Sequence, residues 1–193
     1  MTITSKEELI QYWKEHSNSK LDNKVYGTDF YGFSEEIIKH IQKYENPESS
    51  FTLHELGCNL GRNLSEIKKN FPNATLSGND VNEYALENHF DDLDIFYYDT
   101  AEFLVSEDKV FDYIITSAHL VHVHNREDEI LKKYIPMKFR KKLIIIEQNR
   151  QDEKKGIKFP RNYDDFFNGS LNVIDKYDKF SISYNLLVYE HAK

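Results

Sequence analysis

The sequence has little of what several classes of protein require. It contains a single cysteine, Cys58, among 193 residues, so an intrachain disulfide is impossible and a multi-cysteine zinc site is excluded. No apolar run is longer than four residues, so we expect no transmembrane helix. The first residues lack the apolar stretch of a secretory signal, and we therefore expect a cytoplasmic protein.

Positive charge is also scarce. The 25 Lys and Arg residues are outnumbered by 33 Asp and Glu residues, which gives a net charge of −8. Such a chain lacks the basic surface of a general nucleic-acid binder, and anionic lipid would repel it. We therefore expect no nucleic-acid partner and no membrane partner. The mean hydropathy of −0.68 is low, but a hydrophobic content of 39% is enough to fill the core of one domain.

The first fifty residues are predicted to be helical. Ser5 and Glu8 form a capping box ahead of one apolar helix face, and a second helix starting at Ser34 should stop before Pro47. Several aromatic side chains of this part could cover a ligand, with ordinary core packing as the alternative. These are Tyr12, Trp13, Tyr26, Phe30 and Tyr31. We expect residues 1–50 to form a helical cap and residues 51–193 to form the core domain.

From residue 51 onward, β-prone runs alternate with helical patterns, as in βαβ units. Strands are predicted over residues 51–56, 74–78, 95–98, 111–116 and 143–147. The apolar runs at 114–115 and 143–146 are typical of parallel strands that are covered on both faces. Segments 171–177 and 183–190 are joined by too few residues for a crossover helix, so they should form an antiparallel pair. The pattern predicts an α/β domain with a mostly parallel sheet.

The most informative segment joins the first predicted strand to a helix through Gly57, Cys58, Asn59 and Gly61. Open α/β sheets bind ligands at this end of their strands, and glycine lets the backbone approach a ligand closely. Asn59 tolerates a positive φ, so it can replace a middle glycine. The third glycine of a dinucleotide fingerprint is absent, as is the Gly-Lys-Ser/Thr of a P-loop. Glu55, just before the turn, would repel a pyrophosphate but suits an amino group or a sulfonium.

Polar residues also follow the next three predicted strands. Asp80 lies nineteen residues after Gly61, at a strand end where a carboxylate can accept hydrogen bonds from both ribose hydroxyls. Asp99 comes nineteen residues after Asp80, and Ser117 follows the fourth strand. Asp99 could equally be a cap for a helix that starts near Ala101. Four consecutive strand ends are therefore expected to face one edge of the sheet.

These segments resemble the ordered motifs of class I S-adenosylmethionine (SAM)-dependent methyltransferases. The resemblance covers roughly residues 50–150, and the terminal hairpin suits the reversed seventh strand of that fold. It implies a Rossmann-like, mostly parallel seven-stranded sheet with an antiparallel C-terminal strand and helices on both faces. Asn59 departs from the middle glycine usual in the family. The glycine segment is also similar to methyltransferases associated with bacterial pseudaminic-acid clusters.

The resemblance further implies that SAM is the cofactor. By this resemblance Gly57, Cys58 and Gly61 line the methionine part of SAM. Asp80 binds the ribose, and Val81 packs on the adenine. The adenine amino group donates to Asp99, with Thr100 beside it. The candidate cofactor-binding residues are Glu55, Gly57, Cys58, Asn59, Gly61, Asp80, Val81, Asp99, Thr100 and Ser117.

Three histidines follow the fourth predicted strand: His119, His122 and His124. Histidine titrates near neutral pH, so His119 or His122 is a candidate general base, with simple packing as the alternative. The irregular spacing is poor for a metal, and we expect none. Glu147 is a second candidate for a base or a substrate contact, and Arg161 would suit a carboxylate or phosphate.

The sequence therefore predicts a SAM-dependent methyltransferase that acts on an O or N atom of a small molecule. The Asn/Asp-Pro-Pro-Tyr/Phe motif associated with base or amide nitrogens is absent after the fourth strand, which disfavours a nucleic-acid adenine target. We expect a small metabolite or a sugar as the acceptor, because 193 residues leave no room for an added protein- or RNA-docking domain. The first alternative is a non-catalytic SAM-binding protein of the same fold, and the second is a different nucleoside-binding α/β enzyme. A monomer or a homodimer is expected.

Overall fold

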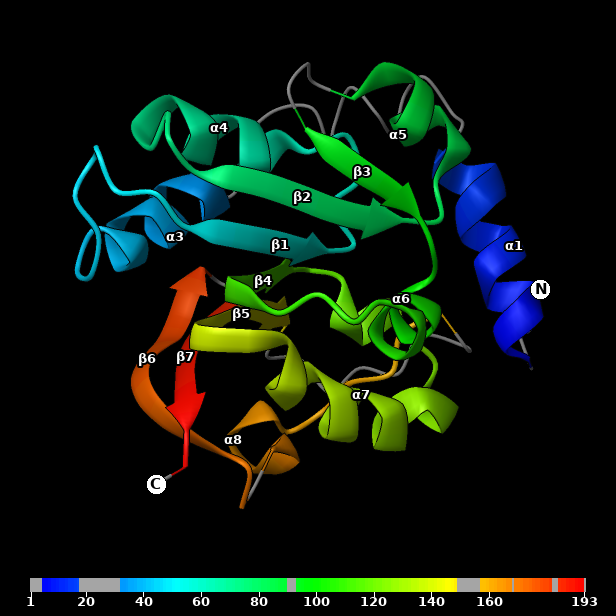
Figure 1. Cartoon of the computed structure of the whole chain (residues 1–193). Helices are drawn as coiled ribbons and strands as arrows, with labels where there is room; N and C mark the ends of the chain where they lie inside the picture. The colour runs from blue at the N-terminus through cyan, green and yellow to red at the C-terminus, as the bar shows by residue number, and fades with distance from the viewer. Residues whose placement is uncertain are drawn as a thin grey trace.

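The computed structural model describes residues 5–17, 32–89, 93–148, 157–167, 169–181 and 184–192 (Figure 1). Its helices are α1 (Lys6–Ser17), α3 (Phe33–Ile41), α4 (Arg62–Asn70), α5 (Glu83–Asn88), α6 (Thr100–Ser106), α7 (Asp128–Tyr134) and α8 (Tyr163–Phe166). Its strands are β1 (Thr52–Leu56), β2 (Thr75–Asp80), β3 (Asp94–Tyr97), β4 (Phe111–Ser117), β5 (Phe139–Gln148), β6 (Leu171–Ser181) and β7 (Tyr184–His191). Three short 3₁₀ turns are η1 (Leu120–His122), η2 (Asn125–Glu127) and η3 (Ile135–Lys138). The aromatic residues Tyr26, Phe30 and Tyr31 lie outside the described residues.

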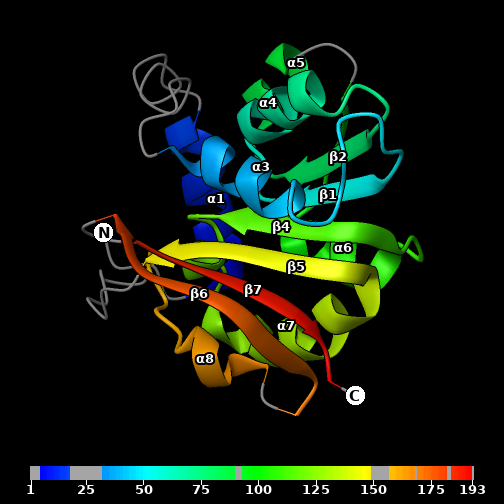
Figure 2. The ribbon, with the colours of Figure 1, turned by 90° about the vertical axis from the view of Figure 1, so that its left-hand side faces the viewer.

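The strands form one seven-stranded sheet in the order β3-β2-β1-β4-β5-β7-β6. Figure 2 shows this order from β2 through β1, β4, β5 and β7 to the edge strand β6. Strands β1 to β5 pair in parallel, whereas β7 is antiparallel to both β5 and β6. The predicted parallel strands and terminal antiparallel pair are thus confirmed. The chain moves outward from β1 to β3 and then returns to the other side of β1 to form β4. Ligands of open α/β sheets bind where the strand order reverses in this way.

Helices cover both faces of the sheet (Figures 1 and 2). On one face, α3 and α4 bury Ile37, Ile41 and Leu64 against β1, β4 and β5. On the other face, α6 and α7 bury Phe103 and Leu131 against the same strands. Side chains alternate along a strand, so the unbroken apolar runs of β4 and β5 supply both cores.

Local signals explain where several helices begin and end. The Oγ of Ser5 accepts a hydrogen bond from the Glu8 amide at the start of α1, as the capping box predicts. The α3 helix ends at Ile41, earlier than Pro47 alone predicts, and turns follow it. At the start of η2, Nδ1 of His124 accepts from the amide of Arg126 and caps this short turn.

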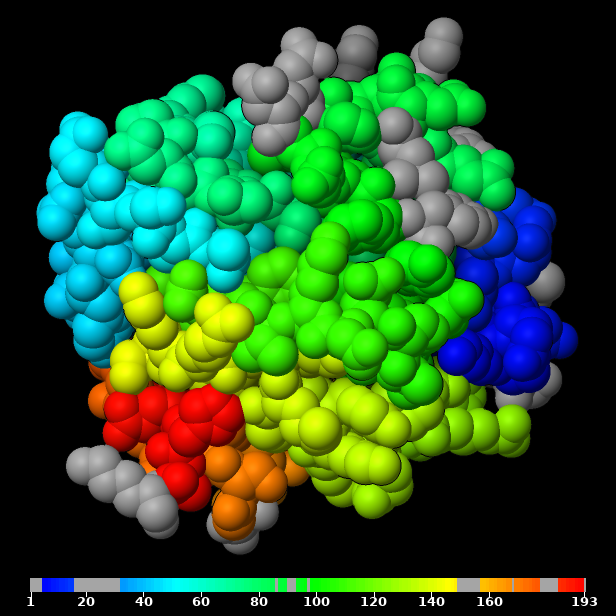
Figure 3. Space-filling view, in the orientation of Figure 1, coloured from blue at the N-terminus to red at the C-terminus, as the bar shows by residue number. Residues whose placement is uncertain are grey.

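The first helix lies beside the carboxyl ends of β1, β2 and β3 (Figure 1). In the space-filling view its blue surface lies directly against the green surface of the central segments (Figure 3). Its Leu9 is buried and packs with Phe159. Within the described part of the chain, none of the helices is long and apolar enough to cross a membrane.

Candidate functional site

The turn after β1 has the backbone conformation that its sequence predicts. Gly57, Asn59 and Gly61 have φ values of 69°, 49° and 79°, in the left-handed region. The prediction that Asn59 tolerates a positive φ is confirmed. The amides of Gly57 and Cys58 both donate to the carbonyl of Asn79, and the Gly61 amide donates to Cys58. These amides are therefore engaged within the protein, which disfavours a phosphate at this turn.

Glu55 is the centre of a buried polar network where the strand order reverses. Its Oε1 accepts from Asn63 Nδ2 at 2.6 Å and from Ser117 Oγ at 3.3 Å. Asn63 Nδ2 also donates to Ser117 at 2.8 Å, and Ser34 donates to Asn63 Oδ1. The other carboxyl oxygen, Oε2, is buried and has no hydrogen-bond partner among the described residues. Burial raises the pKa of Glu55 to about 7.

Asp80 joins the end of β2 to the glycine turn. Its Oδ2 accepts from the Asn59 amide at 2.8 Å, and its Oδ1 accepts from the Asn82 amide at 3.0 Å. Burial raises the pKa of Asp80, although these backbone hydrogen bonds act in the opposite direction. The next residue, Val81, is half-buried. The structure thus brings Asp80 beside the turn and fixes its orientation.

Asp99 caps α6 and also contacts the first helix. Its Oδ1 accepts from the amides of Ala101 and Glu102, so the capping alternative is confirmed. Its Oδ2 lies 3.3 Å from Lys6 Nζ, which is also 3.3 Å from a carboxyl oxygen of Glu127. Lys6 therefore links α1 to two segments at the carboxyl edge of the sheet.

The imidazole of His119 lies over the glycine turn. A Cβ atom placed on Gly57 would come within 2.0 Å of His119 Cγ. The Nε2 atom of His119 is 2.7 Å from Oγ1 of Thr100, which is itself buried. Burial lowers the pKa of His119 to about 4, so the ring is neutral at pH 7. The structure thus brings Gly57, Thr100 and His119 together.

His122 points to a different group of residues. Its Nδ1 is 2.9 Å from the carbonyl oxygen of Ile157, and only a protonated nitrogen can donate to that acceptor. The proton of the neutral ring is therefore on Nδ1, which leaves Nε2 as a proton acceptor. The Trp13 ring packs against His122 at a centroid distance of 4.4 Å. Burial lowers the pKa of His122 to about 4.

Two further candidates have roles different from those expected. Both oxygens of Glu147 accept backbone N–H groups of residues 119–121. Arg161 was expected to meet a substrate anion, but its guanidinium is buried against Asp128 and several backbone carbonyls.

Cys58 is buried within a hydrophobic core, and burial raises the pKa of its thiol, which agrees with a packing role. In the part of the chain that the structure describes, no group of three or more His, Cys, Asp or Glu residues could hold a metal ion.

No protein-family model matches this sequence, and no curated protein matches it. Solved structures do match. The magnesium protoporphyrin IX methyltransferase of Synechocystis PCC 6803 has a TM-score of 0.72 at 11% identity, over 95% of this chain and 97% of that chain. The 1,6-didemethyltoxoflavin-N1-methyltransferase of Burkholderia thailandensis has a TM-score of 0.67 at 10% identity, over 100% of this chain and 93% of that chain. TehB from Haemophilus influenzae has a TM-score of 0.63 at 14% identity, over 88% of this chain and 65% of that chain.

The chain has the fold of class I SAM-dependent methyltransferases. The predicted fold class is thus confirmed, including the antiparallel C-terminal strand. Within this methyltransferase fold, the glycine turn, Glu55, Asp80, Asp99 and Ser117 all lie at the carboxyl edge of the sheet.

Sequence reasoning missed two residues of this methyltransferase-fold site. Asn63 bridges Glu55 and Ser117 from the first turn of α4, and Lys6 bridges Asp99 and Glu127. The position of Asn63 directly after the glycine turn was an available signal. Lys6 gave none, because its partners are far away in the sequence.

Proposed function

We propose that this chain is a SAM-dependent methyltransferase that transfers a methyl group to an oxygen or nitrogen atom of a small molecule. The observation that carries the proposal is the connected set of strand ends around the glycine turn. Glu55 is linked to Ser117, Asp80 to Asn59, and the ring of His119 lies over Gly57. Neighbours in fold that were crystallised with SAM or S-adenosylhomocysteine support the choice of cofactor.

The chemistry of these residues fits the two polar ends of SAM. The buried Oε2 of Glu55 has no partner among the described residues, and an unsatisfied buried oxygen costs free energy. An ammonium group of a ligand would satisfy it. Each oxygen of Asp80 accepts one backbone N–H group, and a carboxylate has further lone pairs for the two hydroxyls of a ribose. Gly57, Cys58 and Gly61 would line the methionine part.

The adenine end of the proposed site involves α1. We assign Val81 to packing on the adenine and Asp99 to its amino group, with Thr100 beside them. Asp99 already caps α6 and pairs with Lys6, so a ligand there would share Oδ2 with Lys6 or displace it. This contact supports the proposal that the N-terminal segment covers the cofactor. The division into a cap over residues 1–50 and a core over 51–193 remains part of the same proposal.

When bound, SAM supplies a methyl group that its sulfonium already activates, so alignment and exclusion of water provide much of the rate. A hydroxyl acceptor must also lose its proton as the new bond forms. His122 is the better candidate to receive that proton, because Nδ1 is fixed by Ile157 and Nε2 carries the lone pair. His119 is restricted by its contact with Thr100, and we assign it to shaping the methyl-donor end.

A small acceptor fits the surroundings of His122. Trp13 packs edge-on against His122, and Tyr12 packs against Trp13 at 85°, so the two rings offer an aromatic surface. Aromatic rings bind the apolar faces of other rings, which agrees with a sugar-derived or heterocyclic acceptor. The net charge of −8 argues against a nucleic-acid acceptor. Two of the fold neighbours are named for small molecules, magnesium protoporphyrin IX and 1,6-didemethyltoxoflavin.

The test is an acceptor screen with wild-type protein, SAM and panels of nucleotide sugars and amines. Formation of S-adenosylhomocysteine is measured by mass spectrometry. We expect at least one acceptor to raise the rate of S-adenosylhomocysteine formation above the acceptor-free rate. H122Q should lower the rate measured with that acceptor and should still bind SAM. If SAM binds but no acceptor class gives turnover, a non-catalytic SAM-binding protein becomes the better account.

A further inference from the structure

The segment that carries the candidate catalytic histidines is held by two buried charges. We call residues 118–124 the histidine turn. It starts at Ala118, whose φ of 53° is in the left-handed region that alanine adopts only at a cost. It continues through η1, where a single short turn provides few hydrogen bonds of its own. A segment of this kind needs external contacts to keep one conformation.

Glu147 provides those contacts on the amide side. This residue lies near the end of β5 and is 1% exposed. Its Oε1 accepts from the amides of His119 at 2.9 Å and Leu120 at 2.6 Å, and its Oε2 accepts from the amide of Val121 at 3.3 Å. One carboxylate thus receives three consecutive backbone N–H groups. Burial raises the pKa of Glu147 to about 7, and the three backbone N–H groups act in the opposite direction. Above pH 7 the acceptor is therefore an ionised carboxylate, whose hydrogen bonds are about twice as strong as those of a neutral acceptor.

Arg161 provides the contacts on the carbonyl side. Its Nη1 donates to the carbonyls of Leu120 and Phe159, and its Nη2 donates to the carbonyl of Val123 at 2.8 Å. Asp128 accepts from Nε at 2.8 Å and lies 2.6 Å from Nη2. Four hydrogen bonds and a close ion pair with Asp128 thus engage all three nitrogens of the guanidinium. Arg161 is therefore directed at the protein itself.

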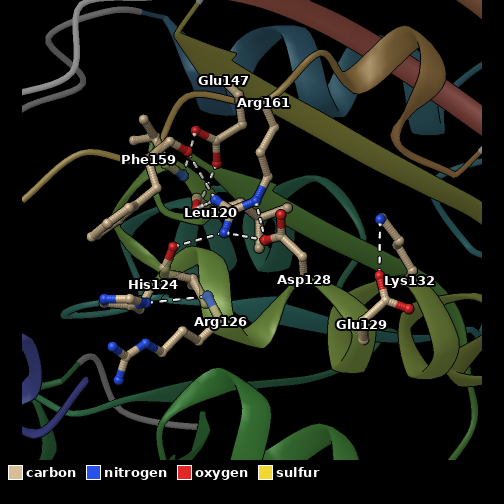
Figure 4. Close-up of polar contacts among 11 residues, drawn as sticks. Leu120, His124, Arg126, Asp128, Glu129, Lys132, Glu147, Phe159 and Arg161 are labelled. Carbon is tan, nitrogen blue, oxygen red and sulfur yellow. Dashed lines mark hydrogen bonds and ion pairs between the residues drawn. The ribbon is translucent and has the colours of Figure 1, made fainter. Parts of the chain in front are cut away.

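The two side chains meet at one residue, Leu120. Leu120 donates its N–H group to Glu147 and accepts from Arg161 at its carbonyl, as the close-up shows (Figure 4). Apolar side chains of similar size often give equal or greater stability than a buried ion pair. They could not, however, accept three N–H groups or donate to three carbonyls. The charges therefore define the shape of the turn more than they stabilise the fold.

We propose that Glu147 and Arg161 are positioning residues, which fix the histidine turn so that Nε2 of His122 is presented to the methyl acceptor. This role rests on the proposed function, because it assigns His122 to the reaction. Neither residue touches a reacting atom in this account. Both act through the backbone between β4 and α7, on which His119 and His122 are mounted.

The test compares E147Q with E45Q in the full-length protein. Glu45 is a matched control, because its side chain is 9% exposed and it accepts from Tyr113 and Lys141 near the amino ends of β4 and β5. The first readout is the tautomer of His122, from ¹⁵N NMR of its ring nitrogens, assigned with H122Q. The second is the emission of Trp13, the single tryptophan, which packs on His122. Neither readout requires a known acceptor.

We expect E147Q to change both signals, because a glutamine amide places a donor against the backbone N–H groups. E45Q should leave both signals as in wild type. SAM affinity of E147Q should stay within about threefold of wild type, while kcat for any acceptor falls at least about tenfold. A folded E147Q with unchanged ring signals and unchanged Trp13 emission would overturn the proposal.

A second variant covers the case in which E147Q does not fold. R161K retains the charge but loses the planar guanidinium. We therefore expect smaller changes in the same two signals, the His122 ring nitrogens and the Trp13 emission. Unchanged signals in folded R161K would then overturn the proposal. The two hypotheses also fail separately. If the wild type does not bind SAM, the proposed methyltransferase function is wrong, while the NMR comparison still decides whether Glu147 and Arg161 hold the turn.

Discussion

His119 lies over Gly57 so closely that the position has no space for a side chain. A Cβ on Gly57 would approach Cγ and Nδ1 of His119 to 2.0 and 2.1 Å, and φ at Gly57 is 69°. Two separate penalties therefore oppose substitution, one steric and one from the backbone. The first depends on His119 and the second does not.

We predict that G57A lowers the free energy of unfolding by about 1–3 kcal/mol or more, measured by urea denaturation. The double variant G57A/H119A should recover the steric part and retain the backbone part. H119A alone serves as the reference for losing the ring. If G57A lowers the free energy of unfolding as much in the H119A background as in the wild type, the close contact between the two residues is wrong.

Ligand binding should release a proton from Glu55. Burial raises the pKa of Glu55 to about 7 in the free protein, and a cationic group beside its unpartnered Oε2 would favour the carboxylate. We therefore expect SAM binding at pH 6 to release close to one proton, and binding well above pH 7 to release almost none. Calorimetry in two buffers of different ionisation enthalpy measures this number.

E55Q is the variant that isolates this proton. It should abolish the release at pH 6 and weaken SAM affinity by about ten- to a hundredfold, since the glutamine cannot supply a charge. S117A removes a neutral donor to Oε1 and a neutral acceptor for Asn63, and it should keep the release because Glu55 is unchanged. Equal proton release by E55Q and wild type would exclude Glu55 as its source.

His54 should contribute to acid unfolding. Its ring is fully buried, stacks on Phe103 at a centroid distance of 4.0 Å and contacts Ser77 and Asn79. Burial lowers the pKa of His54 to about 3 from a usual 6.5. Because the folded-state pKa is depressed, the unfolded chain binds the proton first. The contribution of His54 is therefore complete above pH 6.5 and is lost as the pH falls toward 3.

We predict that the stability of H54Q depends less steeply on pH than that of wild type between pH 6 and pH 4. The difference between the two slopes of unfolding free energy against pH should approach one proton, or about 1.4 kcal/mol per pH unit. Urea denaturation across this range measures it, and the other titrating groups cancel in the comparison. Parallel curves for the two proteins would show that His54 is not held neutral.

Lys6 should control the exchange of α1 amides with solvent. Lys6 pairs with Asp99 and Glu127, and partly exposed ion pairs contribute little to global stability. We expect K6M to change the free energy of unfolding by less than about 1 kcal/mol, while the α1 amides exchange faster with deuterium. The control is K39M, whose partners Glu35 and Glu36 lie on its own helix. Unchanged protection of α1 in K6M would mean that Lys6 does not hold this helix in place.

Much of the fold follows from signals that are local in the sequence. The glycine turn was predictable because Gly57, Asn59 and Gly61 are the residue types that adopt a positive φ at low cost. The antiparallel pair of β6 and β7 followed from the length of one connection. These features depend on a few neighbouring residues, so the sequence alone reveals them.

The parts of the site that depend on distant residues were not predictable. Arg161 has the chemistry of an anion-binding residue, yet its partners Leu120 and Val123 lie about forty positions earlier in the chain. Asp99 lies where a cofactor contact is expected, but it also pairs with Lys6, a residue far earlier in the chain. Only packing decides whether such a charge faces a ligand or the protein itself.

The central claim is that the carboxyl edge of this sheet holds SAM, and calorimetry tests it most directly. Wild-type protein is titrated with SAM, S-adenosylhomocysteine and NAD, and D80N is titrated in parallel. We predict micromolar binding of both sulfur compounds, no binding of NAD, and affinity at least about tenfold weaker in D80N. No heat of binding from either sulfur compound at concentrations well above micromolar, in protein shown to be folded, would contradict the account.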